Sequence, residues 1–136
     1  MKVRVCLDNE RFQDKNAAKR AIKEINNRIV NCKVEIPLNV LVYEVGQIGG
    51  TFTPAVLYKE RKVSGFQEMQ VFCLDFDNGK LTLEDIFERC RKVHLPIVFV
   101  YETFSSSEEC GKYRVGFIHL EPIYHVEVAS FVVWWI

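Results

Sequence analysis

The stretch VFCLDFDNGKLTLEDIF, residues 71–87, decides how the rest of this sequence is interpreted. An apolar run reaches two aspartates one residue apart, Asp75 and Asp77, and then stops at Asn78-Gly79. Side-chain alternation along a strand places both carboxylates on the same face, about 6–7 Å apart by the rise per residue. Two like charges at that spacing cost free energy unless a cation or a ring of donors binds them. The pair therefore indicates either a metal site at the end of a buried strand or the polar start of a turn.

The chain around this stretch shows strand and helix patterns in alternation. Thr82, followed by Asp85 three residues later, resembles a capping box and predicts a helix over 83–93. The Ser-rich segment TFSSSEECGK, residues 103–112, is typical of a loop. Continuous apolar runs on either side of these elements predict strands of the kind that helices cover, and the last of them is expected to end at Pro122. The expected strands are 69–76, 97–101 and 113–120.

The first fifty residues indicate a strand, a helix and further extended structure. Residues 3–7 predict a short strand, and Asp14 can cap a helix over 15–30, whose apolar positions recur at helical spacing. Residues 34–45 are β-branched and apolar but contain Pro37, which favours an edge strand or two short strands. The other face of the helix is basic, which usually means solvated surface and less often phosphate contact. That face carries Lys15, Lys19, Arg20, Lys23 and Arg28.

Length and element order together bound the fold class. With 136 residues, of which 49% are hydrophobic, the chain can bury one core and is too short for two comfortable domains. We expect a single domain, with an N-terminal βαβ part over 1–50 and a second part over 51–136. The order of the elements predicts an α+β fold in which helices pack on a mixed β-sheet.

Charge and cysteine usage narrow the class of protein. Eighteen basic and eighteen acidic residues give a formal net charge of zero, so binding to nucleic acid would have to depend on local patches. The five cysteines lack CxxC spacing, and the sequence shows neither a signal peptide nor an apolar run long enough to span a membrane. We therefore expect a reduced, cytoplasmic protein that does not contact membranes.

Oxygen ligands and cations surround the opening stretch. Carboxylates such as Asp75 and Asp77 suit Mg²⁺ or Mn²⁺, which also bind phosphate oxygens. A loop expected over 47–66 precedes them and the Ser-rich loop follows, and both carry positive charge. If these cations converge in space, they form a groove for single-stranded nucleic acid or a nucleotide. Enzymes that catalyse nucleotidyl transfer combine such phosphate-binding donors with a metal ion. The cations are Lys59, Arg61, Lys62, Lys112 and Arg114.

Three motifs follow one another in the order in which a known family carries them. DFDNG ends a strand at residues 75–79, YETFS follows at 101–105, and YRVGF begins the next strand at 113–117. On this basis residues 51–129 resemble the catalytic domain of phage and plasmid replication proteins of the archaeo-eukaryotic primase superfamily. The resemblance implies a primase catalytic core with an RRM-like half.

The same resemblance implies roles for individual residues. It implies that Asp75 and Asp77 bind the divalent metal, Mg²⁺ or Mn²⁺. Many members of the superfamily have histidine where Arg114 stands. Arginine can bind a phosphate bidentately, although it does not act as an acid or base at neutral pH. The residues expected to lie against the phosphates of an incoming nucleotide are Thr103, Ser105, Lys112 and Arg114.

The family pattern also includes a third acidic residue and an Arg-Phe-Phe-Gly-Gly-like strand, which this sequence lacks, so we expect a truncated primase core. Two functions follow. The first is a primase-derived protein of a phage or plasmid-type mobile element, which binds nucleic acid or a nucleotide, or inhibits a host nucleic-acid-processing enzyme, without full catalysis. The alternative is a metal-dependent nucleotidyltransferase module, a DNA primase or polymerase, of a replication protein. The apolar segment 127–136 also predicts a homodimer contact.

Overall fold

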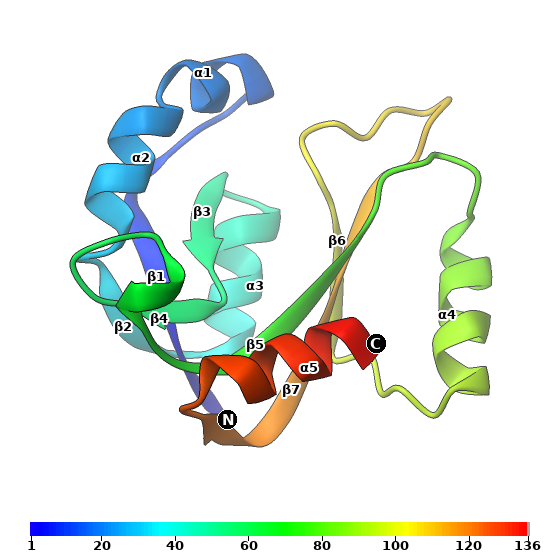
Figure 1. The fold of residues 1–136 in the computed structure, drawn as a ribbon. Helices are drawn as coiled ribbons and strands as arrows, with labels where there is room; N and C mark the ends of the chain where they lie inside the picture. Colours follow the sequence, from blue (N-terminus) through cyan, green and yellow to red (C-terminus); the bar gives the residue numbers. More distant parts are fainter. Residues whose placement is uncertain (136) are drawn as a thin grey trace.

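The computed structural model describes the backbone of residues 1–135 and the side chains of residues 1–132, and it shows an α+β protein (Figure 1). The strands are β1 (Lys2–Arg11), β2 (Lys33–Pro37), β3 (Gly50–Thr53), β4 (Ala55–Leu57), β5 (Phe66–Phe76), β6 (Phe99–Glu102) and β7 (Tyr113–Ile123). The helices are α1 (Lys15–Arg20), α2 (Ile22–Ile29), α3 (Leu38–Gly46), the 3₁₀ turn η1 (Val63–Gly65), α4 (Leu83–Lys92) and α5 (Val126–Trp135).

The strands of the described chain form two antiparallel sheets. The N-terminal sheet has the order β2-β1-β3 and the C-terminal sheet the order β4-β5-β7-β6. The expected α+β class is confirmed, whereas the strands are divided between two antiparallel sheets instead of one sheet of mixed direction. The division falls at Pro54, which lies between β3 and β4 and lacks the N–H that a continuous ladder would use.

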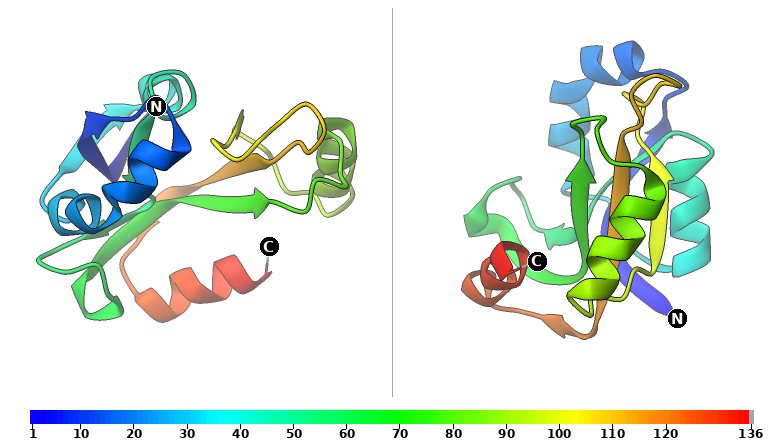
Figure 2. Two further views of the ribbon diagram at one scale, coloured as in Figure 1. Left: turned by 90° about the horizontal axis from the view of Figure 1, so that it is seen from above. Right: turned by 90° about the vertical axis from the view of Figure 1, so that its right-hand side faces the viewer.

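The C-terminal sheet is covered on both faces (Figure 2). One face, with Val71 and Phe99, packs on the N-terminal sheet and α3 through a cluster that includes Val5 and Leu41. The opposite face, with Phe72, packs on α4 and α5. Neighbouring residues of a strand point to opposite faces, and Val71 and Phe72 are 0% and 2% exposed. The unbroken apolar run of β5 is therefore explained by burial on both sides.

The basic helix expected over 15–30 is two helices. The chain leaves helical geometry at Ala21, with φ −92° and ψ 9°, between α1 and α2. Asp14 caps α1 as expected, since its carboxylate accepts a backbone N–H at 2.8 Å. Ile25 and Ile29 of α2 are buried against the N-terminal sheet. The break lets α1 take a different direction from the helix that packs on the sheet.

Arg28 belongs to an ion pair and not to the solvated face expected for it. Its Nε donates to Oδ1 of Asp8 at 2.6 Å and its Nη2 donates to Oδ2 at 2.7 Å. Asp8, on β1, is 0% exposed. The hydrogen bonds with Asp8 raise the pKa of Arg28 above its ordinary value, so its guanidinium stays charged. The pair joins α2 to β1.

The extended structure expected over 34–45 ends at Pro37, and this corrects the sequence interpretation. Pro37, at φ −57°, precedes α3. Leu41 and Val45 are 0% and 8% exposed, which is the spacing of one helix face. Tyr43, which would share a strand face with Leu41, is 58% exposed. The helical period of the apolar residues therefore prevails over their β-branched composition.

The second half of the chain follows the sequence prediction more closely. The Thr82 backbone N–H donates to Oδ2 of Asp85 at 2.9 Å, and the Asp85 N–H donates to Oγ1 of Thr82 at 3.2 Å. This is the expected capping box at the start of α4. Backbone donation from Thr82 also lowers the pKa of Asp85. Ile86 and Cys90 are the residues of α4 that are buried.

The strand pattern differs most from the expectation at residues 47–66 and at the end of β7. The loop expected over 47–66 contains β3 and β4. β7 continues past Pro122, because its register against β5 shifts between Met69 and Val71 and the chain bulges there. Leu120, in the bulge, is 83% exposed. Proline is tolerated at such an irregular strand end because no ladder hydrogen bond requires its nitrogen.

The C-terminal segment, for which strand or helix was open, is helix α5. Its Ala129 is buried against the C-terminal sheet, whereas Val128 and Phe131 are 48% and 60% exposed. The dimer contact expected over 127–136 stays a prediction, and the side chains of 133–136 lie outside the described part of the chain. Within that part, no helix combines the length and apolar character that crossing a membrane requires.

Candidate functional site

Three strands of the C-terminal sheet bring three polar side chains into one row. Asp75 of β5 lies opposite Arg114 of β7, and Arg114 lies opposite Tyr101 of β6. Arg114 donates from Nε to Oδ1 of Asp75 at 2.5 Å and from Nη2 to Oδ2 at 2.7 Å. Its Nη1 donates to the hydroxyl oxygen of Tyr101 at 3.3 Å. These three side chains, called the row below, consist of a bidentate ion pair between Asp75 and Arg114 and a further hydrogen bond from Arg114 to the Tyr101 phenol.

The surroundings of this row fix its protonation. The hydrogen bonds with Asp75 raise the pKa of Arg114, against the opposing effect of burial. Burial raises the pKa of Tyr101, so its phenol stays neutral. Cys73 lies two residues before Asp75 on the same strand, and burial raises the pKa of its thiol to about 12. A protonated thiol is neither a nucleophile nor a metal ligand.

The carboxylates of the DFDNG motif do not form a free pair. Both oxygens of Asp75 accept from Arg114, and Asp77 is exposed beyond the end of β5. Among the residues that the structure describes, no group of three or more His, Cys, Asp or Glu side chains is placed to bind a metal ion. A Mg²⁺ or Mn²⁺ ion at Asp75 would compete with Arg114 for the carboxylate oxygens and lie beside its like charge, so the residues fit the ion poorly in this arrangement. The metal site stays a prediction from the sequence.

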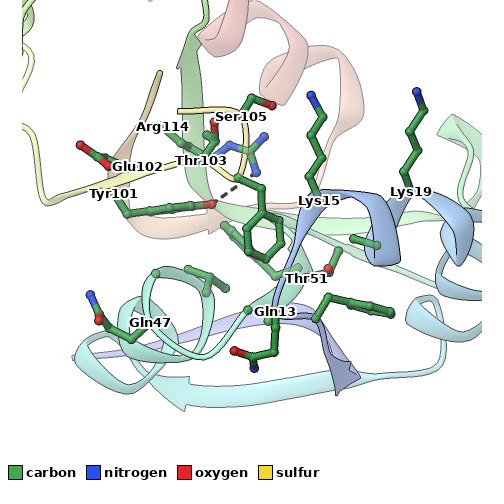
Figure 3. Close-up of a pocket in the computed structure, with 18 of the residues that line it drawn as sticks. Gln13, Lys15, Lys19, Gln47, Thr51, Tyr101, Glu102, Thr103, Ser105 and Arg114 are labelled. Atoms are coloured by element: carbon green, nitrogen blue, oxygen red, sulfur yellow. Dashed lines mark hydrogen bonds between the residues drawn. The ribbon is translucent and has the colours of Figure 1, made fainter. Parts of the chain in front are cut away.

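The row ends at a cleft of about 710 Å³ between the two sheets (Figure 3). Tyr101 and Arg114 line it, whereas neither Asp75 nor Asp77 is among its lining residues. Polar groups from both halves of the chain surround the opening, and apolar side chains contribute much of the remaining wall. The apolar lining includes Phe12, Ile22, Val45, Phe52 and Phe104.

Two of the predicted loop residues lie in this cleft. Thr103 and Ser105 line it, next to Arg114 (Figure 3). The hydroxyl oxygen of Thr103 is buried and has no hydrogen-bond partner. Lys112 is not part of the lining, but its backbone closes the loop, since the Thr103 N–H donates to its carbonyl at 3.0 Å. The structure therefore brings Thr103, Ser105 and Arg114 together in one cleft, and their contact with the phosphates of a nucleotide stays a prediction.

The N-terminal half supplies cleft residues that the sequence indicated only as part of a basic helix face. Lys15 and Lys19, both exposed, reach the cleft from α1 (Figure 3). The end of the molecule that carries α1 also carries the Ser-rich loop in both ribbon views (Figures 1 and 2). Thr51 of β3 adds a hydroxyl. The basic face of 15–30 was the available signal, but its spacing could not show which lysines face another part of the chain.

The turn after β5 and the Ser-rich loop are in contact. Gly79 has φ +65°, and a Cβ added there would lie 2.1 Å from Sγ of Cys110. Only glycine fits both the positive φ and this close approach. The contact couples the DFDNG turn to the loop that carries Thr103 and Ser105. The two motifs are therefore neighbours in space, although about thirty residues separate them in the sequence.

The other predicted basic residues lie elsewhere. Lys59, Arg61 and Lys62 lie between β4 and β5, at the end of β5 opposite to Asp75. The length of β5 separates the two sets by about 30 Å at the usual rise per residue. Lys62 pairs with a neighbouring glutamate at 3.2 Å, and Arg61 hydrogen-bonds a side chain of α2. The structure does not bring these residues together with Arg114, and their role in nucleic-acid binding stays a prediction.

Comparison with protein-family models, curated proteins and solved structures finds no match for this chain. The resemblance to the primase superfamily therefore depends on the three motifs and their order. The function is therefore inferred from the geometry of the row and the cleft.

Proposed function

We propose that this protein binds the phosphate-bearing part of a nucleotide, or of a single nucleic-acid strand, in the cleft between its two sheets. In this proposal it is a primase-derived binding protein of a phage or plasmid-type mobile element, without full catalysis. The observation that carries the proposal is the lining of the cleft. Lys15, Lys19 and Arg114 supply positive charge. The cleft lining also includes the hydroxyl side chains of Thr51, Tyr101, Thr103 and Ser105.

The remaining wall suits the rest of such a ligand. Aromatic side chains stack on bases without regard to their sequence, and Phe12 and the exposed Phe104 are part of the lining. Sites for small molecules commonly have volumes of roughly 300–1,000 Å³, a range that includes this cleft. Positive charge together with apolar surface is the combination that a nucleotide requires.

Reversing the charge of α1 tests the proposal. We expect Lys15→Glu with Lys19→Glu to weaken binding of a fluorescent single-stranded oligonucleotide and of ATP about tenfold to hundredfold, because charge-assisted phosphate contacts are lost. Fluorescence anisotropy and calorimetry measure the two affinities. For the oligonucleotide, the slope of log affinity against log salt should become less steep by about 0.7 per lost contact.

Lys23→Glu is the matched control, because Lys23 is exposed on the adjoining helix and is not part of the cleft. It should change both affinities much less than the double reversal. Equal weakening by control and double variant would show that general charge, and not the cleft, attracts the ligand. Failure of the wild-type protein to bind either probe would refute the proposed function.

A metal-dependent nucleotidyltransferase is the second candidate, favoured by the order of the motifs and by the contact of Asp75 with a cleft residue. Transfer needs metals that place both the attacking hydroxyl and the leaving phosphate. Because Asp75 is engaged with Arg114, we expect no incorporation of labelled nucleotide on a primed or unprimed single-stranded template with Mg²⁺ or Mn²⁺. A gel assay measures this against an Asp75→Asn, Asp77→Asn background. Incorporation above that background would favour the enzyme.

A further inference from the structure

The charged side chains that line the cleft are mostly positive. A nucleotide site that depends on a divalent cation presents carboxylates toward the phosphates, and the cation offsets their repulsion. Here the charged residues that line the described cleft are Lys15, Lys19 and Arg114, with Glu102 as the acid among them. The lining is therefore already positive without an added ion.

Arg114 still has donors for a ligand. Its guanidinium has five N–H groups. Asp75 accepts two of them, and the Tyr101 hydroxyl accepts a third. Two N–H groups are therefore left, on a side chain that is 32% exposed and lines the cleft. The partners on either side fix the plane of the guanidinium, which reduces the entropy that ligand binding costs.

The Ser-rich loop offers an independent sign of an absent ligand. The hydroxyl of Thr103 is buried in the wall of the cleft without a hydrogen-bond partner, although buried polar groups are nearly always paired. On rotation of the Thr103 side chain toward the cleft, this hydroxyl would donate to a phosphate oxygen bound between Arg114 and the loop. Ser105 of the same loop also lines the cleft.

We propose that the cleft binds the phosphate groups of its ligand without a divalent cation, and that the Arg114 guanidinium, positioned by Asp75 and Tyr101, supplies the charge that a metal ion would otherwise provide. This inference depends on the proposed function. It gives Asp75 the role of a positioning residue for Arg114. A divalent cation at Asp75 would compete with the guanidinium for the carboxylate oxygens and would lie beside its like charge, so the observed row opposes metal binding.

The test uses the full chain and ATP as the probe. Calorimetric titration of the wild-type protein in EDTA should give an affinity at least equal to that in MgCl₂ or MnCl₂, because free ATP presents its full negative charge. Inorganic triphosphate should compete with ATP in EDTA if the phosphate groups carry the recognition. These two measurements require no substitution and so do not depend on the stability of a variant.

Substitutions then locate the charge. Arg114→Ala should weaken ATP binding in EDTA about tenfold to hundredfold, the range for lost charge-assisted hydrogen bonds. Arg114→Lys should recover part of the lost affinity, since lysine restores the positive charge but not the two parallel N–H donors of the guanidinium. Asp75→Asn should weaken binding less than Arg114→Ala, because asparagine still accepts from the guanidinium. Arg89→Ala, the same exchange at an exposed position of α4, is the control.

Two results would overturn the inference, and they are distinguishable. ATP binding that requires Mg²⁺ or Mn²⁺ and is abolished by Asp75→Asn would show a metal site, while the proposed function would stand. Absence of ATP and oligonucleotide binding in every buffer would refute the inference together with the proposed function. Binding in EDTA that Arg114→Ala leaves intact would assign the recognition to the lysines of α1 and would also overturn the role of Arg114.

Discussion

Arg28→Met is expected to destabilise the protein severely, although Arg28 belongs to a helix whose basic face looked solvated in the sequence. The variant leaves the carboxylate of Asp8 without a cationic partner at a position that is 0% exposed. Removing one partner of a buried ion pair costs about 3–5 kcal/mol because the other charge stays desolvated. In this protein the charge that stays desolvated is the Asp8 carboxylate. Urea unfolding followed by circular dichroism measures it.

Two further proteins make this result specific. Lys23→Met, on the same helix and exposed, should change the free energy of unfolding by a few tenths of a kcal/mol at most. Asp8→Asn added to Arg28→Met should restore part of the lost stability, because it removes the unpaired charge. A double variant as unstable as Arg28→Met would show that the loss does not come from the buried carboxylate.

Leu41→Ala is expected to lower the free energy of unfolding by about 2–5 kcal/mol, the range for a large aliphatic side chain deleted from a core. Leu41 is 0% exposed and lies in the cluster that joins the two sheets. The deletion leaves a cavity under α3, next to Val45, which lines the cleft. The same urea experiment measures the loss, and ATP affinity should fall less than stability does.

Tyr43→Ala is the comparison that tests the helix itself. In a strand, Leu41 and Tyr43 would share a face and both deletions would be costly. In α3 they point in different directions, and Tyr43 is 58% exposed. We therefore expect Tyr43→Ala to be tolerated. Losses of similar size at both positions would contradict the helical assignment of 38–46.

The elements that the sequence predicted well have local determinants. The capping box of Thr82 and Asp85 lies within one turn of helix, and β5 contains the continuous apolar run 71–74 just before Asp75. The helix after Pro37 was missed because its residues are mostly apolar, with Asn39 and Glu44 as the exceptions, so neither the alternation of a strand nor the period of a helix is distinct in them. Only packing on the sheet distinguishes the two.

The composition of the site could be predicted only in part. Asp75, Thr103, Ser105 and Arg114 were found from their motifs, and the structure places the last three in one cleft. The pairing of Asp75 with Arg114 is a matter of strand register between β5 and β7, which no short motif encodes. The arrival of α1 beside the Ser-rich loop depends on how two sheets pack, so its lysines could not be assigned in advance.

The change of sheet at Pro54 has a consequence for biosynthesis. The strands of the N-terminal sheet lie within residues 2–53 and those of the C-terminal sheet within residues 55–123. The ribosome therefore synthesises all strands of the N-terminal sheet before it begins β5. At about 5–20 residues per second, the nascent chain waits several seconds for the strands that bring Val71 and Phe99 to the shared core. During that time the apolar face of the first sheet is open to water, which makes the unfinished chain a target for chaperones that recognise exposed apolar surface.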